Sequence, residues 1–444
     1  MLKQCMIGLF AAALTLSASA QESASDKAAR MQWFEEAKLG IFIHWGIYSV
    51  QGIDESWSFY NNYIPYKDYM KQLDGFTAKR YDPEAWADLI AESGAQYAVL
   101  TTKHHDGVAL WDTKLSDLSV VKQTPARRDL VAPFVKAVRS RGLKAGLYFS
   151  QLDWSHPDYP HHTRQEKRYD PQDDMARWHR FLKFQKGQLK EMATKFKPDL
   201  IWFDGDWDFG ADLWEARAQR EMLFEINPQV ILNSRLNGYG DYGTPENGLP
   251  ITRPQDRYWE LCLTTNDSWG YQPNDRDYKS VHQIIGVFTE CLRMGGNLLL
   301  DIGPKPDGTI AQEQIDRLRG LGRWVRKHRE AVYGVKAGLP HGHFYGPTAL
   351  SSDSTILYLY LPHRPNGPVA LKGIKNKIHR VWTVGHGTKL HWDLQMKAYW
   401  SSVPGVVYID VPESVLDEEW TVLAVLLDGK VDLYQGKGHV IESN

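Results

Sequence analysis

The sequence predicts an α/β protein in which an irregular (β/α)8-like (TIM) barrel is followed by an antiparallel β-sandwich. Between residues 30 and 335, short apolar runs alternate with longer amphipathic stretches, as expected of parallel βαβ units. From about residue 336 the runs are short and often alternating, with Gly, Pro, Asn and Asp between them, which is typical of a sandwich. The number of units favours a barrel, although eight clean units cannot be counted.

The predicted elements follow in chain order. The barrel strands are expected at 39–45, 97–102, 143–150, around 201, 229–234 and 297–301, and the helices at 83–93, 130–140, 173–196, 213–225, 281–293 and 310–330. The sandwich strands are expected at 354–361, 369–371, 379–384, 389–392, 405–411 and 421–427. Pro83 suits the first turn of its helix, where a backbone N–H has no partner to lose.

The first residues predict export. A basic Lys3, the apolar run Met6–Leu16 and the small residues Ala18–Ala20 form a secretory signal peptide that would be cleaved before Gln21. We therefore expect a periplasmic or secreted protein with a signal peptide at 1–20, a barrel domain at 21–335 and a β-sandwich domain at 336–444.

Composition narrows the class of protein. A net charge of −2 gives no reason to expect nucleic acid or an anionic membrane as a partner. After the leader, no apolar run is long enough for a membrane span, and Cys262 and Cys291 are too few for a disulfide framework. The 17 Trp and 22 Tyr must largely line a core or a binding cleft. The oligomeric state stays open.

The most informative stretch lies around residue 200. The apolar run Leu200–Phe203 predicts a strand buried on both faces, and Asp204, Asp206 and Asp208 follow it at once. A carboxylate at the end of a barrel strand is held rigidly and faces the ligand-binding loops. Carboxylates beside indole rings suit chemistry on sugars. For Asp206 and Asp208, an acidic turn that caps the next helix is an equal alternative.

Other predicted strands also end in polar and aromatic groups. In a barrel these ends converge on one mouth, where imidazole, indole and guanidinium groups can hold several hydroxyls. The residues at or beyond these strand ends are His44, Trp45, His104, His105, Tyr148, Asp153, Trp154, Arg235 and Trp269.

The main alternative role for these histidines is to bind a metal ion. His104 and His105 are adjacent, so in an extended chain they face opposite ways, and His156, His161 and His162 lack the helical spacing of a zinc site. We therefore expect no catalytic metal. A serine-hydrolase elbow and a phosphate-binding loop are also missing from the sequence.

Five segments together resemble glycoside hydrolase family 29, the α-L-fucosidases. They are Trp33–Gly46, Lys103–Gly107, Trp202–Asp204, Ser268–Tyr271 and Gly296–Pro304. The resemblance implies a barrel followed by a β-sandwich, and retaining, exo-acting hydrolysis of terminal α-L-fucosyl linkages of glycans without a cofactor. It also implies that Asp204 is the nucleophile. The implied sugar-binding residues are His44, Trp57, His104, His105, Tyr148, Trp202, Arg235 and Trp269.

The resemblance places the acid/base catalyst on a variable loop, where Glu246 and Glu260 compete. Glu246 is favoured because its spacing matches the family and its loop is rich in Gly, whereas Glu260 sits among bulky residues that would raise its pKa or bury it in the barrel wall. One departure concerns Glu55, a further sugar ligand by resemblance: Ser56 separates it from Trp57, whereas relatives commonly have Glu and Trp adjacent.

Two other functions stay open from the sequence. One is a retaining glycosidase for a related sugar, such as an α-L-galactoside. The other is a non-catalytic sugar-binding protein, which would require that the nucleophile or the acid be missing.

Overall fold

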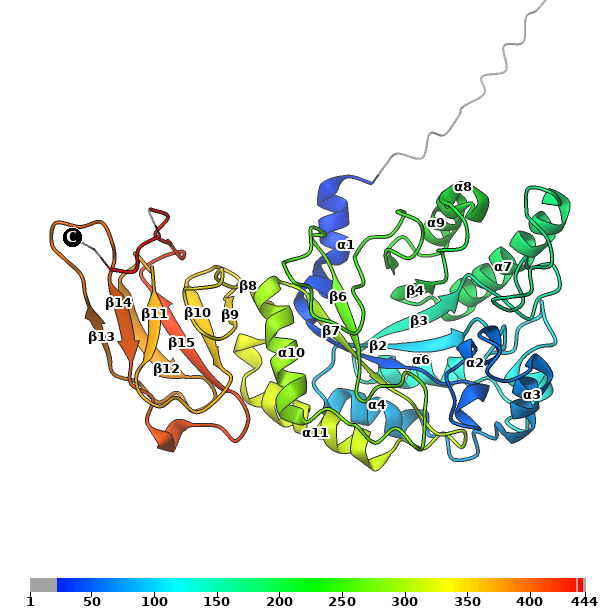
Figure 1. Cartoon of the computed structure of the whole chain (residues 1–444), viewed down its shortest axis with the longest axis horizontal. Coiled ribbons are helices and arrows are strands. Elements are labelled where there is room, and N and C mark those ends of the chain that lie inside the picture. The colour runs from blue at the N-terminus through cyan, green and yellow to red at the C-terminus, as the bar shows by residue number, and fades with distance from the viewer. Residues whose placement is uncertain (1–21, 437, 442–444) are drawn as a thin grey trace, which may run out of the picture.

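The computed structural model describes residues 22–436 and 438–441, so the predicted signal peptide lies outside the described residues. A curled parallel sheet with helices around it lies beside a smaller antiparallel β-region (Figure 1). No helix among the described residues is long and apolar enough to cross a membrane.

The parallel sheet has seven strands in the order β5-β4-β3-β2-β1-β7-β6. They are β1 (Leu39–Ile43), β2 (Tyr97–Lys103), β3 (Lys144–Ser150), β4 (Leu200–Asp204), β5 (Ile231–Leu232), β6 (Glu260–Thr264) and β7 (Asn297–Ile302). Every residue of β1 and β4 is buried, as expected of parallel strands covered on both faces. Because the strands run the same way, their carboxyl ends meet at one mouth.

The barrel closes without a regular eighth strand. The chain at 241–247, here called the closing segment, runs between β5 and β6. Its isolated parallel bridges are Asn233 with Tyr242, Gly243 with Trp259, and Glu246 with Cys262. The Cys262 N–H donates to the Pro245 carbonyl at 3.1 Å, and the Asn247 N–H donates to the Cys262 carbonyl at 2.9 Å. The backbone around Glu246 is therefore fixed to the sheet, whereas the sequence led us to expect a Gly-rich loop there.

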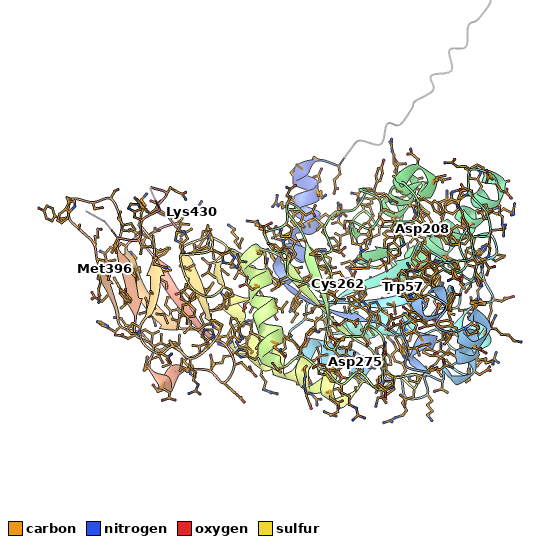
Figure 2. The ribbon with its side chains drawn as sticks, viewed as in Figure 1. Trp57, Asp208, Cys262, Asp275, Met396 and Lys430 are labelled. Atoms are coloured by element: carbon orange, nitrogen blue, oxygen red, sulfur yellow. The ribbon has the colours of Figure 1, made fainter. Side chains whose placement is uncertain are left out.

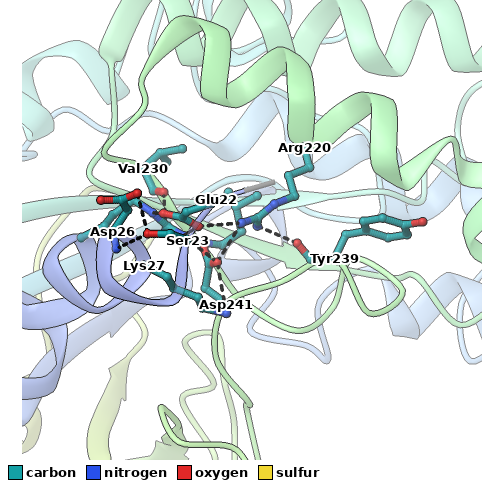
Figure 3. A network of polar contacts seen from close by, with 10 residues as sticks. Glu22, Ser23, Asp26, Lys27, Arg220, Val230, Tyr239 and Asp241 are labelled. Carbon is teal, nitrogen blue, oxygen red and sulfur yellow. Dashed lines mark hydrogen bonds and ion pairs between the residues drawn. The ribbon is translucent and has the colours of Figure 1, made fainter. Parts of the chain in front are cut away.

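An ion-pair network anchors the start of the closing segment (Figure 3). The carboxylate of Asp241 accepts from both terminal nitrogens of Arg30 in α1 (Ala24–Ala37) at 2.8 and 2.9 Å, and from Arg220 in α9 (Ala216–Ile226) at 3.1 Å. The Leu232 N–H in β5 donates to the same carboxylate at 3.0 Å. Asp241 and Arg30 are both buried, and each has a further partner, because Glu22 accepts from Arg30 at 2.7 Å and Arg220 donates to Asp241.

Helices connect the strands, and side chains next to their first turns cap several of them. Asp82 caps α4 with Pro83 in the first turn, and Ser280 and Gln283 form a capping box on α10. The longer helices besides α1 and α9 are α4 (Pro83–Glu92), α6 (Val131–Ser140), α7 (Met175–Phe196), α10 (Val281–Met294) and α11 (Gln312–Lys327). The short ones are α2 (Trp57–Tyr60), α3 (Tyr66–Met70), α5 (Val120–Gln123), α8 (Ala211–Trp214) and the 3₁₀ turns η1 (Ile47–Ser49), η2 (Lys71–Gly75), η3 (Arg329–Ala331) and η4 (Glu413–Val415).

The C-terminal region contains two antiparallel sheets, with orders β12-β15-β10-β9-β8 and β11-β14-β13. Its strands are β8 (Lys336–Ala337), β9 (Thr348–Leu350), β10 (Ile356–Leu361), β11 (Val369–Lys372), β12 (Ile378–Thr383), β13 (Trp392–Gln395), β14 (Val406–Ile409) and β15 (Thr421–Leu427). Trp420 ties it to the barrel, because its indole N–H donates to the His282 carbonyl at 3.0 Å and its carbonyl accepts from Trp324 at 2.7 Å. Figure 2 places Met396 at the end of the molecule away from the barrel, which contains Trp57 and Cys262.

The structure departs from the predicted elements in a few places. The expected helix at 213–225 is two helices, because Glu215 adopts a φ of +50° between α8 and α9. The expected strand at 229–234 shortens to β5, since the Asn233 side chain bonds the N–H and carbonyl of Phe203 at 2.8 and 2.9 Å and replaces the strand pairing. The strand expected at 389–392 begins at Trp392. The helix α1 and the strand β6 were not predicted.

Candidate active site

A cavity of about 330 Å³ opens where the carboxyl ends of the barrel strands meet. This volume is at the lower end of small-molecule sites. It is lined by Phe42, His44, Glu55, Trp57, His104, Tyr148, Trp202, Asp204, Trp207, Arg235, Glu246 and Trp269. Ten of the twelve predicted site residues are in this lining, and the two outside it are His105 and Glu260.

Asp204 is the last residue of β4 and lies at the floor of the cavity. Its Oδ2 accepts from the Tyr148 hydroxyl at 2.9 Å, and its Oδ1 accepts from the Arg235 guanidinium at 2.7 Å. Nε2 of His105 is 3.6 Å from Oδ2. Burial alone would raise the pKa of Asp204, but Arg235, His105 and Tyr148 outweigh it and lower the pKa below its ordinary value. The carboxylate is therefore ionised and held in place.

Glu246 faces the same guanidinium from the closing segment. Its Oε2 accepts from Nη2 of Arg235 at 2.5 Å, while Nη1 of that arginine holds Asp204. The side chain of Glu246 is 40% exposed, compared with 12% for Asp204. The two carboxylates thus differ in environment, one enclosed and one at the rim, and a single cation lies against both.

Glu260 occupies a different position. It is the first residue of β6, is fully buried, and accepts from the Tyr97 hydroxyl at 2.5 Å and from the Trp202 indole at 2.9 Å. Burial raises its pKa to about 7, despite these hydrogen bonds. Glu260 does not line the cavity, but it contacts Trp202, which does. The centre of the Trp202 ring lies 4.5 Å from the Arg235 guanidinium carbon.

The inserted Ser56 does not remove its neighbours from the site, because Glu55 and Trp57 both line the cavity. Oε1 of Glu55 accepts from the Gly270 N–H at 2.6 Å, and burial raises the pKa of this carboxyl to about 8. The Ser56 hydroxyl lies 2.5 Å from Nδ1 of His104 and orients that ring.

The three predicted histidines are buried, and burial disfavours the charged form of each. Burial lowers the pKa of His44 to about 3 and that of His105 to about 4, and it lowers the pKa of His104 well below its ordinary value. His105 bonds the Ser150 hydroxyl through Nδ1 at 2.6 Å, and its Nε2 has no hydrogen-bond partner among the described residues. Although His105 is outside the cavity lining, that nitrogen faces the nucleophile candidate.

Aromatic rings form two parts of the wall. Phe42 lies 5.0 Å from Trp202 and 6.2 Å from Trp269 between ring centroids, which makes an apolar corner. At the rim, Trp207 stacks on Trp57 at 6.0 Å and is half exposed. Neither Phe42 nor Trp207 was identified as a site residue from the sequence. For Trp207, its position between Asp206 and Asp208, just beyond a strand end, was the available signal.

The other acids of that run have structural contacts. Asp206 accepts from the Asn237 N–H at 2.8 Å, and Asp208 accepts from the Tyr159 hydroxyl at 2.6 Å and from His161 at 2.9 Å. Neither lines the cavity, and neither caps α8, whose N-cap is Gly210 without a side-chain hydrogen bond. Both acids therefore have structural contacts, but not the helix cap that the sequence offered as an alternative.

A barrel with two facing carboxylates and aromatic walls at the carboxyl ends of its strands is the arrangement of a glycoside hydrolase. Residues 10–330 match the family described as alpha-L-fucosidase. The tissue alpha-L-fucosidase of Rattus norvegicus is 31% identical over 392 residues, covering 81% of this chain and 83% of the rat protein. The chain belongs to the α-L-fucosidases of glycoside hydrolase family 29.

Solved structures agree with this assignment. Alpha-L-fucosidase isoenzyme 1 from Paenibacillus thiaminolyticus is 33% identical with a TM-score of 0.81, covering 90% of this chain and 99% of that one. A family 29 alpha-L-fucosidase from Bacteroides thetaiotaomicron, trapped as a covalent intermediate, is 27% identical with a TM-score of 0.80, covering 90% and 96%. The fold is therefore the fucosidase barrel with its C-terminal β-region, as predicted.

Proposed function

We propose that Asp204 is the nucleophile and Glu246 the acid/base catalyst of a retaining, exo-acting α-L-fucosidase. The contact of one guanidinium with both carboxylates carries this proposal, because it brings them to the same cavity from β4 and from the closing segment. A retaining enzyme needs its carboxyl groups about 5–5.5 Å apart, with the sugar between them.

The chemistry follows from the two environments. Ionised Asp204 attacks the anomeric carbon and forms a fucosyl ester, while Glu246 gives its proton to the departing glycosidic oxygen. Glu246 then takes a proton from the incoming water, which attacks the anomeric carbon and frees Asp204. Arg235 has a donor on each carboxylate, so it stabilises the negative charge that moves between them during these steps.

The walls fit a terminal fucose. The unpartnered Nε2 of His105 lies beside the nucleophile, so it would bond the hydroxyl next to the anomeric carbon. The apolar corner of Phe42, Trp202 and Trp269 suits the C6 methyl group, which has no hydroxyl to desolvate. This corner favours L-fucose over L-galactose. The substrate is a fucosylated glycan. The predicted signal peptide supports export of the protein. The barrel domain ends at residue 335 and the β-sandwich domain begins at 336.

Variants at the three acids test the assignment. Asp204→Asn should reduce turnover of 4-nitrophenyl α-L-fucoside by several orders of magnitude in a protein that still unfolds cooperatively. Glu246→Ala should regain activity with azide, which can attack the fucosyl ester without a general base. The matched variant Glu260→Ala should show no azide rescue, and rescue there without rescue of Glu246→Ala would reverse the assignment.

A further inference from the structure

A buried carboxyl group lies behind the histidine of the first strand. Asp301 in β7 has no exposed surface, and its Oδ1 is 2.7 Å from Nδ1 of His44. The register of β1 and β7 brings the two together, and the His44 N–H donates to the Ile302 carbonyl at 3.0 Å. Oδ2 of Asp301 has no hydrogen-bond partner among the described residues.

The groups around this pair make an extra negative charge costly. Asp301 is close enough to the carboxyl of Glu55 and the phenol of Tyr48 for charge interactions, and His44 is close enough to Asp204, His105 and Arg235. The His44 ring also lies 6.2 Å from the His104 ring and 5.9 Å from the Tyr148 ring between centroids. In the described part of the chain, His44 is the sole basic group within ion-pair distance of Asp301. Among the described residues, the imidazole is thus the one side chain, beside the backbone N–H of His44, that offsets a charge on Asp301.

These neighbours determine how many protons the pair holds. With a proton on Nδ1 alone, Asp301 would be an ionised carboxylate in an apolar, acidic surrounding, which is strongly unfavourable. With two protons the pair is neutral overall, whether the inner proton is on the carboxyl or on Nδ1, and the second proton is on Nε2. Burial favours the neutral pair with two protons, because it raises the pKa of Asp301 well above its ordinary value and lowers the pKa of His44.

We propose that Asp301 is a positioning residue that keeps a proton on Nε2 of His44, so that His44 donates a hydrogen bond to an oxygen of the bound sugar. The His44 ring lines the cavity, and its Nε2 makes no hydrogen bond to the described protein, so this nitrogen is free for a ligand. When alkaline pH removes a proton from the pair, Nε2 becomes an acceptor and sugar binding weakens. The role of His44 as a sugar ligand rests on the proposed function.

The proposed role of Asp301 can be tested without catalysis by measuring the affinity for L-fucose calorimetrically from neutral to alkaline pH. Asp301→Leu removes the partner of Nδ1 and should weaken binding about tenfold to a hundredfold. Asp301→Asn can bond Nδ1 but cannot release a proton, so the alkaline weakening seen in the wild type should disappear. Thr264→Val is the matched control, because Thr264 pairs with Asp301 across the sheet and its hydroxyl bonds the Asn266 carbonyl, away from His44.

The wild-type protein offers a second measurement that does not depend on the folding of a variant. In ¹⁵N-histidine-labelled protein, the His44 signals are assigned by their loss in His44→Asn. We expect a protonated Nε2 at neutral pH that loses its proton on the alkaline side. An unprotonated Nε2 at neutral pH would overturn the proposal, as would identical pH dependence of fucose binding in Asp301→Asn and wild type. Failure of the roles of Asp204 and Glu246 would instead appear in turnover and azide rescue, and would leave these binding data unchanged.

Discussion

Replacing Arg235 with methionine separates its electrostatic role from its bulk. The arginine lies against both carboxylates, its side chain is 19% exposed, and that of Asp204 is 12% exposed. Removing one partner of a buried ion pair costs about 3–5 kcal/mol, and the partial exposure here points to the lower end. Arg235→Met also removes a hydrogen-bond donor that stabilises charge in the transition state, and this loss should reduce kcat by about 10²–10³.

The pH profile should change in a defined direction. Asp204 must be ionised to attack, and Arg235 helps to keep its pKa below the ordinary value. Without the arginine, His105 and Tyr148 alone act against burial, so the pKa of Asp204 rises. The acidic limb of kcat/KM should therefore move to higher pH, because more of Asp204 is protonated at any given acidic pH. The assay is kcat/KM for 4-nitrophenyl α-L-fucoside across acidic to neutral pH.

Arg220→Met is the matched control. Arg220 is 21% exposed in its side chain and also contacts a buried carboxylate, Asp241, but it does not line the cavity. It should lower stability and leave the pH profile unchanged. If Arg235→Met kept kcat/KM within about twofold of wild type, with the same acidic limb, the electrostatic role of Arg235 would be refuted.

Three further variants probe the support of the site. Asp241→Asn should reduce the free energy of unfolding by about 3 kcal/mol, because it removes the buried carboxylate that Arg30 and Arg220 share and leaves Arg30 with Glu22 alone. Calorimetry should show a lower midpoint, and an unchanged midpoint would mean that Asp241 contributes nothing to stability. Ser56→Ala should raise KM about tenfold with little change in kcat, since a hydrogen bond that orients His104 is lost; an unchanged KM would show that packing alone holds the ring. Glu260→Gln should keep turnover within about tenfold, as expected of a residue that contacts Trp202 and not the sugar, and a far larger loss in the well-folded variant would contradict that placement.

The sequence was informative where burial and chemistry coincide. The apolar run before Asp204 fitted a strand covered on both faces, and β4 confirms it, so the acid at its end was predictable from local sequence. The strand β6 was missed, because Glu260 sits at its start and the stretch before it is rich in turn residues. The split helix at Glu215 depends on a single backbone angle that propensity does not reveal.

Distant contacts explain the rest. The choice between Glu246 and Glu260 needed the position of each relative to the cavity, which arises from the closing segment and its bridges to β6. The contacts of Ser56 with His104 and of Asp301 with His44 join residues 48 and 257 positions apart. Local spacing carries no signal for such pairs, so only the folded chain could identify them.

Covalent trapping tests the central claim most directly. The protein would be incubated with 2-fluoro-fucosyl fluoride, digested, and analysed by mass spectrometry with fragmentation that separates Asp204 from Asp206 and Asp208. We predict one fluorofucosyl group per chain, esterified to Asp204. An adduct on another carboxylate would contradict the account, and so would inactivation of turnover without any adduct.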